Sequence, residues 1–96
     1  MTRAQVLQLL DMSKAELASR FGVPALALFG SVVRDASRAD SDVDVLVSFD
    51  EPATSARYFG VQFFLEDLLG RPVDLVTDKA LRPELRPFVE REAVHV

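Results

Sequence analysis

The segment from Asp42 to Phe49 limits the folds open to this 96-residue chain more than any other stretch. Apolar residues occupy every second position from Val43 onward, and side chains alternate between the two faces of a strand. The pattern therefore predicts a β-strand with one face in the core. Asp42 and Asp44 begin the other face, and the strand rise places their Cβ atoms about 6.5–7 Å apart.

Two shorter apolar segments predict further strands. Residues 25–29 read ALALF between a proline and a glycine, and residues 73–77 read VDLVT directly after Pro72. Asp74 lies near the start of its segment and on the non-core face, as the two aspartates of segment 42–49 do. A third carboxylate can therefore join the pair if these two strands lie side by side.

The same residues predict how the strands run. Asp74 stands beside the pair only if strands 42–49 and 73–77 are parallel and joined by a right-handed helical crossover. Gly30, at the end of the first strand, approaches the pair only if that strand runs antiparallel to its neighbour. We expect an α/β (α+β) fold, a small mixed sheet with helices packed on one face, to which residues 94–96 could add an edge strand.

Helical spacing of apolar residues predicts helices over residues 3–21, 54–69 and 83–91. Ser13 with Glu16 has the form of a capping box that could start a second helix. The first segment is therefore interpreted as one broken helix or two short ones.

Phe59 and Phe63 are i, i+4 neighbours that lie off the apolar stripe of helix 54–69. The favoured interpretation is that the N-terminal helix covers them. The alternative is a protein-docking patch, because exposed aromatic pairs are uncommon on monomers.

Composition narrows the class of protein. Hydrophobic residues make up 49% and charged residues 27% of the chain, which predicts a single globular domain over residues 1–96. The net charge of −4 disfavours strong non-specific nucleic-acid binding. Cysteine is absent and His95 is the one histidine, so carboxylates are the plausible metal ligands. No apolar run is long enough to span a membrane, and a cytoplasmic location is expected.

The turn at Gly30 and Ser31, read as the start of a short helix, suits phosphate binding. Glycine permits close approach, while backbone N–H groups and the Ser31 hydroxyl can donate to phosphate oxygens. Arg34 follows one turn later, where it could contact a phosphate. A salt bridge from Arg34 to Asp35, Asp40 or another loop carboxylate is an equal alternative.

The three aspartates suit a divalent metal. Two Mg²⁺ ions about 3.5–4 Å apart can clamp the attacking and leaving oxygens of phosphoryl or nucleotidyl transfer. Mg²⁺ prefers oxygen ligands and keeps several waters, so two or three aspartates and the nucleotide phosphates suffice. Asp74 is then the natural general base for an acceptor hydroxyl.

The residues with a chemical use are Gly30-Ser31, Arg34, Ser41-Asp42-x-Asp44 with the following apolar strand, and Asp74. This set resembles the signature of the DNA polymerase β-like nucleotidyltransferase superfamily. The order of elements is most similar to its minimal nucleotidyltransferase branch, the MNT-domain antitoxins, and the resemblance covers nearly the whole chain.

The resemblance implies a nucleotidyltransferase fold and roles for these residues. Asp42 and Asp44 would bind two Mg²⁺ ions. Asp74 would complete the metal site and activate the acceptor, while Gly30 and Ser31 would hold the triphosphate of ATP. The implied activity is transfer of AMP to a tyrosine of a HEPN-domain ribonuclease toxin, so that the protein acts as an antitoxin within a hetero-oligomer.

Two classes of function stay open. The first is the adenylyltransferase, favoured by the carboxylate trio because clustered aspartates repel each other without a cation. The second is a non-catalytic antitoxin or binding module that neutralises its partner by docking alone. A small-molecule transferase is disfavoured by length, because such enzymes resemble this core with an added substrate domain.

Overall fold

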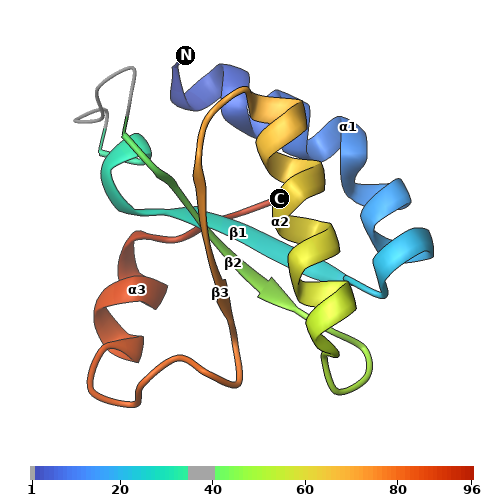
Figure 1. Ribbon diagram of the computed structural model, residues 1–96. Helices are drawn as coiled ribbons and strands as arrows, with labels where there is room; N and C mark the ends of the chain where they lie inside the picture. The colour runs from blue at the N-terminus through green and yellow to red at the C-terminus, as the bar shows by residue number, and fades with distance from the viewer. Residues whose placement is uncertain (1, 35–40) are drawn as a thin grey trace.

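The computed structural model describes residues 2–34 and 41–96. Helices and strands alternate along these two stretches (Figure 1). The elements are α1 (Arg3–Phe21), β1 (Ala25–Phe29), the 3₁₀ helix η1 (Gly30–Val32), β2 (Val43–Ser48), α2 (Ser55–Leu69), β3 (Val73–Thr77), α3 (Arg86–Glu92) and β4 (Val94–His95).

The strands form a mixed sheet in the order β3-β2-β1-β4. β2 pairs with β3 in parallel, and β1 pairs antiparallel with both β2 and β4. The predicted strand directions and the added edge strand are therefore confirmed. The register sets Asp44 opposite Asp74 and Phe29 opposite Asp44. The end of β1 and the starts of β2 and β3 thus meet at one end of the sheet.

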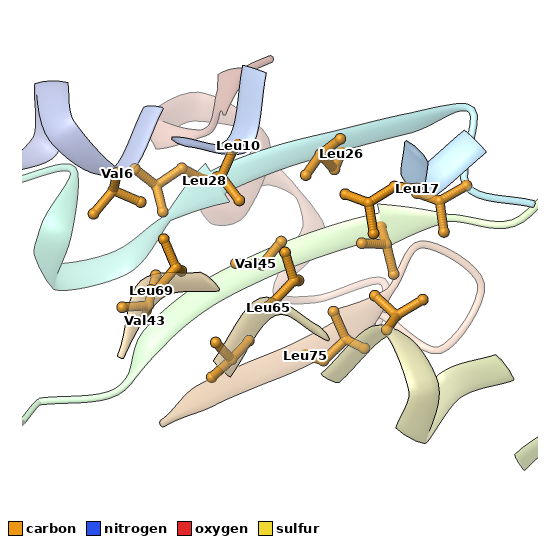
Figure 2. Close-up of a cluster of buried hydrophobic side chains, with 14 of the residues drawn as sticks. Val6, Leu10, Leu17, Leu26, Leu28, Val43, Val45, Leu65, Leu69 and Leu75 are labelled. Atoms are coloured by element: carbon orange, nitrogen blue, oxygen red, sulfur yellow. The ribbon is translucent and has the colours of Figure 1, made fainter. Parts of the chain in front are cut away.

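α1 and α2 cover one face of the sheet and enclose the main core (Figure 2). Leu10 and Leu17 of α1 meet Leu65 of α2 over the inward side chains of β1 and β2, among them Leu28 and Val45. All five are fully buried. Burial of one such side chain contributes about 1.5–3 kcal/mol, so the alternating pattern that predicted β2 also anchors it.

The expectation of helices on one face holds for α1 and α2, whereas α3 lies across the sheet from them (Figure 1). Ala27 and Leu46, on the second face, form a separate apolar cluster with Leu81. Val89 and Ala93 pack against this cluster. The reason is that Leu46 is apolar although it shares the face of Asp44, and α3 with its flanking residues shields it from water.

α1 is continuous, so the interpretation as a broken helix is wrong. The capping box lies at its start, where Thr2 accepts from the Gln5 N–H and Gln5 accepts from the Thr2 N–H. Ser13 lies mid-helix and is buried. Its small size lets the helix pass over the core unbroken. Gly22 ends α1 in the left-handed conformation, φ 69°, as glycine does at a helix C-terminus.

The favoured interpretation of Phe59 and Phe63 as covered residues is also wrong. Their side chains are 49% and 61% exposed, and their rings stack at 6.4 Å. α1 instead contacts another flank of α2, where the Phe21 ring lies edge-on to Phe64 at 5.8 Å. Gly60 makes this approach possible, because a Cβ there would lie 2.9 Å from the Phe21 ring.

Within residues 2–34 and 41–96, no helix is both long and apolar enough to cross a bilayer.

Candidate active site

Gly30 lets a carboxylate approach the turn after β1. The residue is buried with φ 78°, a left-handed value that favours glycine. A Cβ at this position would collide with Asp44 Oδ2 and would stand 2.8 Å from Asp44 Cγ. Any side chain at position 30 would therefore displace Asp44. The short helix expected here is the 3₁₀ helix η1, which includes Ser31, a partly buried residue.

Asp44 and Asp74 form a pair across β2 and β3. They occupy the same register position in the parallel pair. Desolvation by burial, followed by the charge of Asp74 and side-chain hydrogen bonding with it, raises the pKa of Asp44 from 3.8 to about 6. The charge of Asp42 adds to the rise, and that of Arg34 opposes it.

Asp42 and Asp74 are both exposed to solvent, whereas Asp44 is partly buried. Asp42 precedes β2. Within the described ranges 2–34 and 41–96, no three acidic or histidine side chains converge closely enough to hold a metal ion. The structure therefore brings two of the three predicted ligands together, with the third two residues away along the chain.

The donor set nevertheless suits a hard divalent cation. Two neighbouring carboxyl groups offer oxygen ligands, which Mg²⁺ prefers. A cation bound there would offset the repulsion from Asp74 that, after burial, raises the pKa of Asp44.

Glu92 of α3 is a residue of this site that the sequence did not reveal. Its carboxylate accepts from the Gly30 N–H at 2.8 Å and from Arg34 Nη1 at 2.7 Å. Both hydrogen bonds, that of Arg34 foremost, lower the pKa of Glu92. The salt-bridge alternative for Arg34 is thus observed with an unforeseen partner, while Asp35 and Asp40 lie outside the described residues. No local pattern could have linked positions 62 residues apart.

Arg71 is a second missed residue. It is 8% exposed, and its Nε and Nη2 donate to the Ser41 carbonyl oxygen at 3.2 and 2.7 Å. The next residue, Pro72, accepts from the Val43 N–H at 2.9 Å. The backbone is therefore held on both sides of Asp42 by the segment that leads into β3. The sequence signal that could have pointed to it is an arginine placed between a glycine and a proline, directly before a predicted strand.

A family model for the nucleotidyltransferase domain matches residues 10–96. The chain belongs to this family. The matched range contains every residue of the site, from Gly30 to Glu92. The fold is that expected for a nucleotidyltransferase domain, with its aspartates on neighbouring parallel strands.

Relatives of this nucleotidyltransferase domain extend the comparison. Protein adenylyltransferase MntA of Thermococcus cleftensis is 40% identical over 96 residues, which cover 100% of this chain and 97% of the relative. A solved structure described as a minimal nucleotidyltransferase has a TM-score of 0.81 and 38% identity, over 98% of this chain and 95% of the other.

A more distant structure contains a partner. It is the tri-AMPylated Shewanella oneidensis HEPN toxin in complex with MNT antitoxin. The TM-score is 0.61 and the identity 18%, over 97% of this chain and 66% of the compared chain. At this identity the likeness concerns the fold alone.

Proposed function

We propose that this nucleotidyltransferase domain is a Mg²⁺-dependent protein adenylyltransferase that transfers AMP from ATP to a tyrosine hydroxyl of a HEPN-domain toxin and so acts as its antitoxin. The observation that carries the proposal is the Asp44–Asp74 pair facing the Gly30 turn. The 40% identity to protein adenylyltransferase MntA over the whole chain supports the same reaction.

The three aspartates would bind the metal, and one of them would also activate the acceptor. Asp42, Asp44 and Asp74 would hold Mg²⁺, with two ions as the expected number. Bound Mg²⁺ supplies charge neutralisation for the triphosphate and polarises the phosphate under attack. Asp74 accepts the proton of the acceptor hydroxyl, whose oxygen attacks the α-phosphorus while pyrophosphate leaves.

The turn after β1 would hold the triphosphate. The Gly30 N–H, the Ser31 hydroxyl and the Arg34 guanidinium are its donors. In the structure Glu92 accepts from two of these three groups. The Glu92 carboxylate at this position supports an anion-binding role for these donors, and a triphosphate that uses them has to displace Glu92.

The proposal also includes the setting of the reaction. The acceptor is a group on a partner protein, and the working form is a hetero-oligomer. The toxin complex with the same fold makes a HEPN-domain protein the first partner to test. We expect the reaction to take place in the cytoplasm, where ATP is available.

One observation favours a second candidate function. The exposed, stacked Phe59 and Phe63 lie on α2, away from the aspartates, and offer a surface for docking without catalysis. In that case the domain would neutralise the toxin by binding alone.

The two functions separate in one experiment. The domain and the proposed HEPN partner are co-expressed and incubated with ATP and Mg²⁺, and the intact mass of each protein is measured. We expect one or more added masses of AMP on the partner, and none when Asp42→Asn and Asp44→Asn are combined, because both metal ligands lose their charge. The matched control combines Asp11→Asn and Asp67→Asn, because both residues are exposed, on α1 and α2, and neither belongs to the predicted site.

One outcome would contradict the site assignment, and another would contradict the catalytic function. Unchanged transfer by the Asp42→Asn/Asp44→Asn variant would show that the site is wrongly assigned. A tight complex with no added mass for the wild type would favour neutralisation by docking alone.

A further inference from the structure

We propose that the groove between α3 and the starts of η1 and β2 receives the base of the nucleoside triphosphate, with Phe88 as the side chain on which the base stacks. This inference rests on the proposed function and adds the base-binding part of the same site. None of the residues predicted from the sequence supplies such a part.

The groove is continuous with the candidate active site. Its volume is about 510 Å³, and its lining includes Gly30, Arg34, Asp44 and Glu92. Ligand pockets for molecules of nucleotide size have about 300–1,000 Å³. A nucleotide whose phosphates lie at Gly30 therefore has adjoining space for its sugar and base.

The rest of the lining is chemically different. Phe29, Phe88 and Val89 contribute two aromatic rings and an aliphatic side chain. The groove thus combines anion-binding groups with an apolar, aromatic part. A nucleoside triphosphate has the same two halves, because its phosphates are anionic and its base is flat and largely apolar on both faces.

Phe88 is not explained by packing. Val89, the next residue, contacts the apolar cluster of the second sheet face, whereas the Phe88 side chain is 64% exposed. Its ring is accompanied by Arg91, whose guanidinium carbon lies 5.8 Å from the ring centroid. Arg91 also lines the groove, so a second cation joins Arg34 there. An exposed ring beside cations is the type of platform on which nucleobases stack.

Stacking makes a specific demand on position 88. Any base has a π face, so the platform should hold adenine and guanine alike, and an aromatic replacement should preserve it. Stacking contributes about 1–3 kcal/mol per base, which corresponds to a roughly 5- to 150-fold change in affinity.

The test is calorimetric binding of AMP-PNP with Mg²⁺ to the full chain. We expect Phe88→Ala and Phe88→Leu to raise the Kd at least about 5-fold and Phe88→Trp to keep it within about 3-fold. The leucine variant preserves apolar volume, so it guards against a loss of folding in the alanine variant. The matched control is Met12→Ala, because Met12 is 73% exposed on α1, which lies across the sheet from α3.

Inorganic tripolyphosphate is the second probe. It lacks a base, so its affinity should be equal in the wild type and in Phe88→Leu. An unchanged AMP-PNP Kd in Phe88→Ala and Phe88→Leu would overturn the inference and leave the proposed function standing. Equal weakening of both probes would also overturn it, because Phe88 would then support the phosphate site. A wild type that binds neither probe would overturn the proposed function together with this inference.

Discussion

Asp44 is the residue of the candidate active site whose surroundings disfavour its charged form. Its carboxylate lies against Gly30, beside Asp74 and near Asp42, with Arg34 as the opposing charge. Its pKa of about 6 lies above the usual value of 3.8. The protonated form therefore contributes stability that is fully present below about pH 3.8 and lost as the pH rises through about 6.

This gives a stability prediction for Asp44→Asn. Without metal, the free energy of unfolding of the wild type should fall by about 1–2 kcal/mol relative to that of this variant when the pH rises from 4 to 7.5, after allowance for solvent screening. Urea unfolding of both proteins with a chelator at the two pH values measures the difference. Comparison with the variant cancels Glu92, whose lowered pKa acts in the opposite direction.

Parallel stability curves for the two proteins would contradict the assigned environment of Asp44. If Asp44 has the assigned environment, addition of Mg²⁺ at pH 7.5 should stabilise the wild type and leave Asp44→Asn nearly unchanged. The reason is that an ion which binds the folded state but not the unfolded state raises the free energy of unfolding.

At the scale of elements, two segments that contain none of the predicted site residues contact those residues and hold them in place. The end of α3 contributes Glu92, which joins the C-terminal part of the chain to Gly30 and Arg34. The segment between α2 and β3 contributes Arg71 and Pro72, which hold the backbone on both sides of Asp42. The exposed Asp42 side chain therefore depends on these backbone contacts for its position.

We expect Arg71→Lys to raise the Mg²⁺ concentration needed for half-maximal AMP transfer by about 10-fold. Lysine keeps the charge but cannot donate twice to the Ser41 carbonyl oxygen in the geometry of the guanidinium fork. The matched control is Arg86→Lys, because Arg86 Nη2 donates to the Asp78 carbonyl oxygen at 2.9 Å, near the other end of β3. A lowered unfolding temperature with unchanged Mg²⁺ dependence would mean that Arg71 serves only stability.

At the scale of the whole molecule, the proposed catalytic site and the proposed docking surface lie on opposite sides of the sheet. α3 and α2 lie on opposite sides of the sheet (Figure 1). The groove is lined by residues of α3 together with Asp44, whereas Phe59 and Phe63 are exposed on α2. Catalysis and docking can therefore be changed separately. Variants of each surface therefore test adenylyl transfer and docking independently of each other.

We expect Phe59→Ala combined with Phe63→Ala to weaken binding to the HEPN partner by about 10-fold or more, as loss of aromatic anchors does in interfaces. Thermal unfolding and AMP-PNP binding of the isolated domain should stay unchanged, because both rings are exposed. Met12→Ala, at a residue 73% exposed on α1, is the control. Unfolding of the double variant, or full partner affinity, would remove these rings from the docking surface.

The sequence by itself determined the strands and the facing of their aspartates. The alternation from Val43 onward and the short run around Asp74 are local patterns, and side chains that alternate with period two leave one choice of face when one side must be buried. The parallel pairing of Asp44 with Asp74 was predicted from the same parity, as the arrangement that sets Asp74 beside the other aspartates with a helical crossover between the strands, and it is observed.

Only the tertiary structure decided which distant groups meet. Glu92 reaches Gly30 because α3 folds back over the second sheet face, and Phe59 stays exposed because α1 packs at Gly60 and Phe64 instead. Periodicity reports which face of an element is apolar, but it does not report which neighbour covers that face. The contacts that complete the site depend on helix packing across the sheet, so they could not be predicted from local patterns.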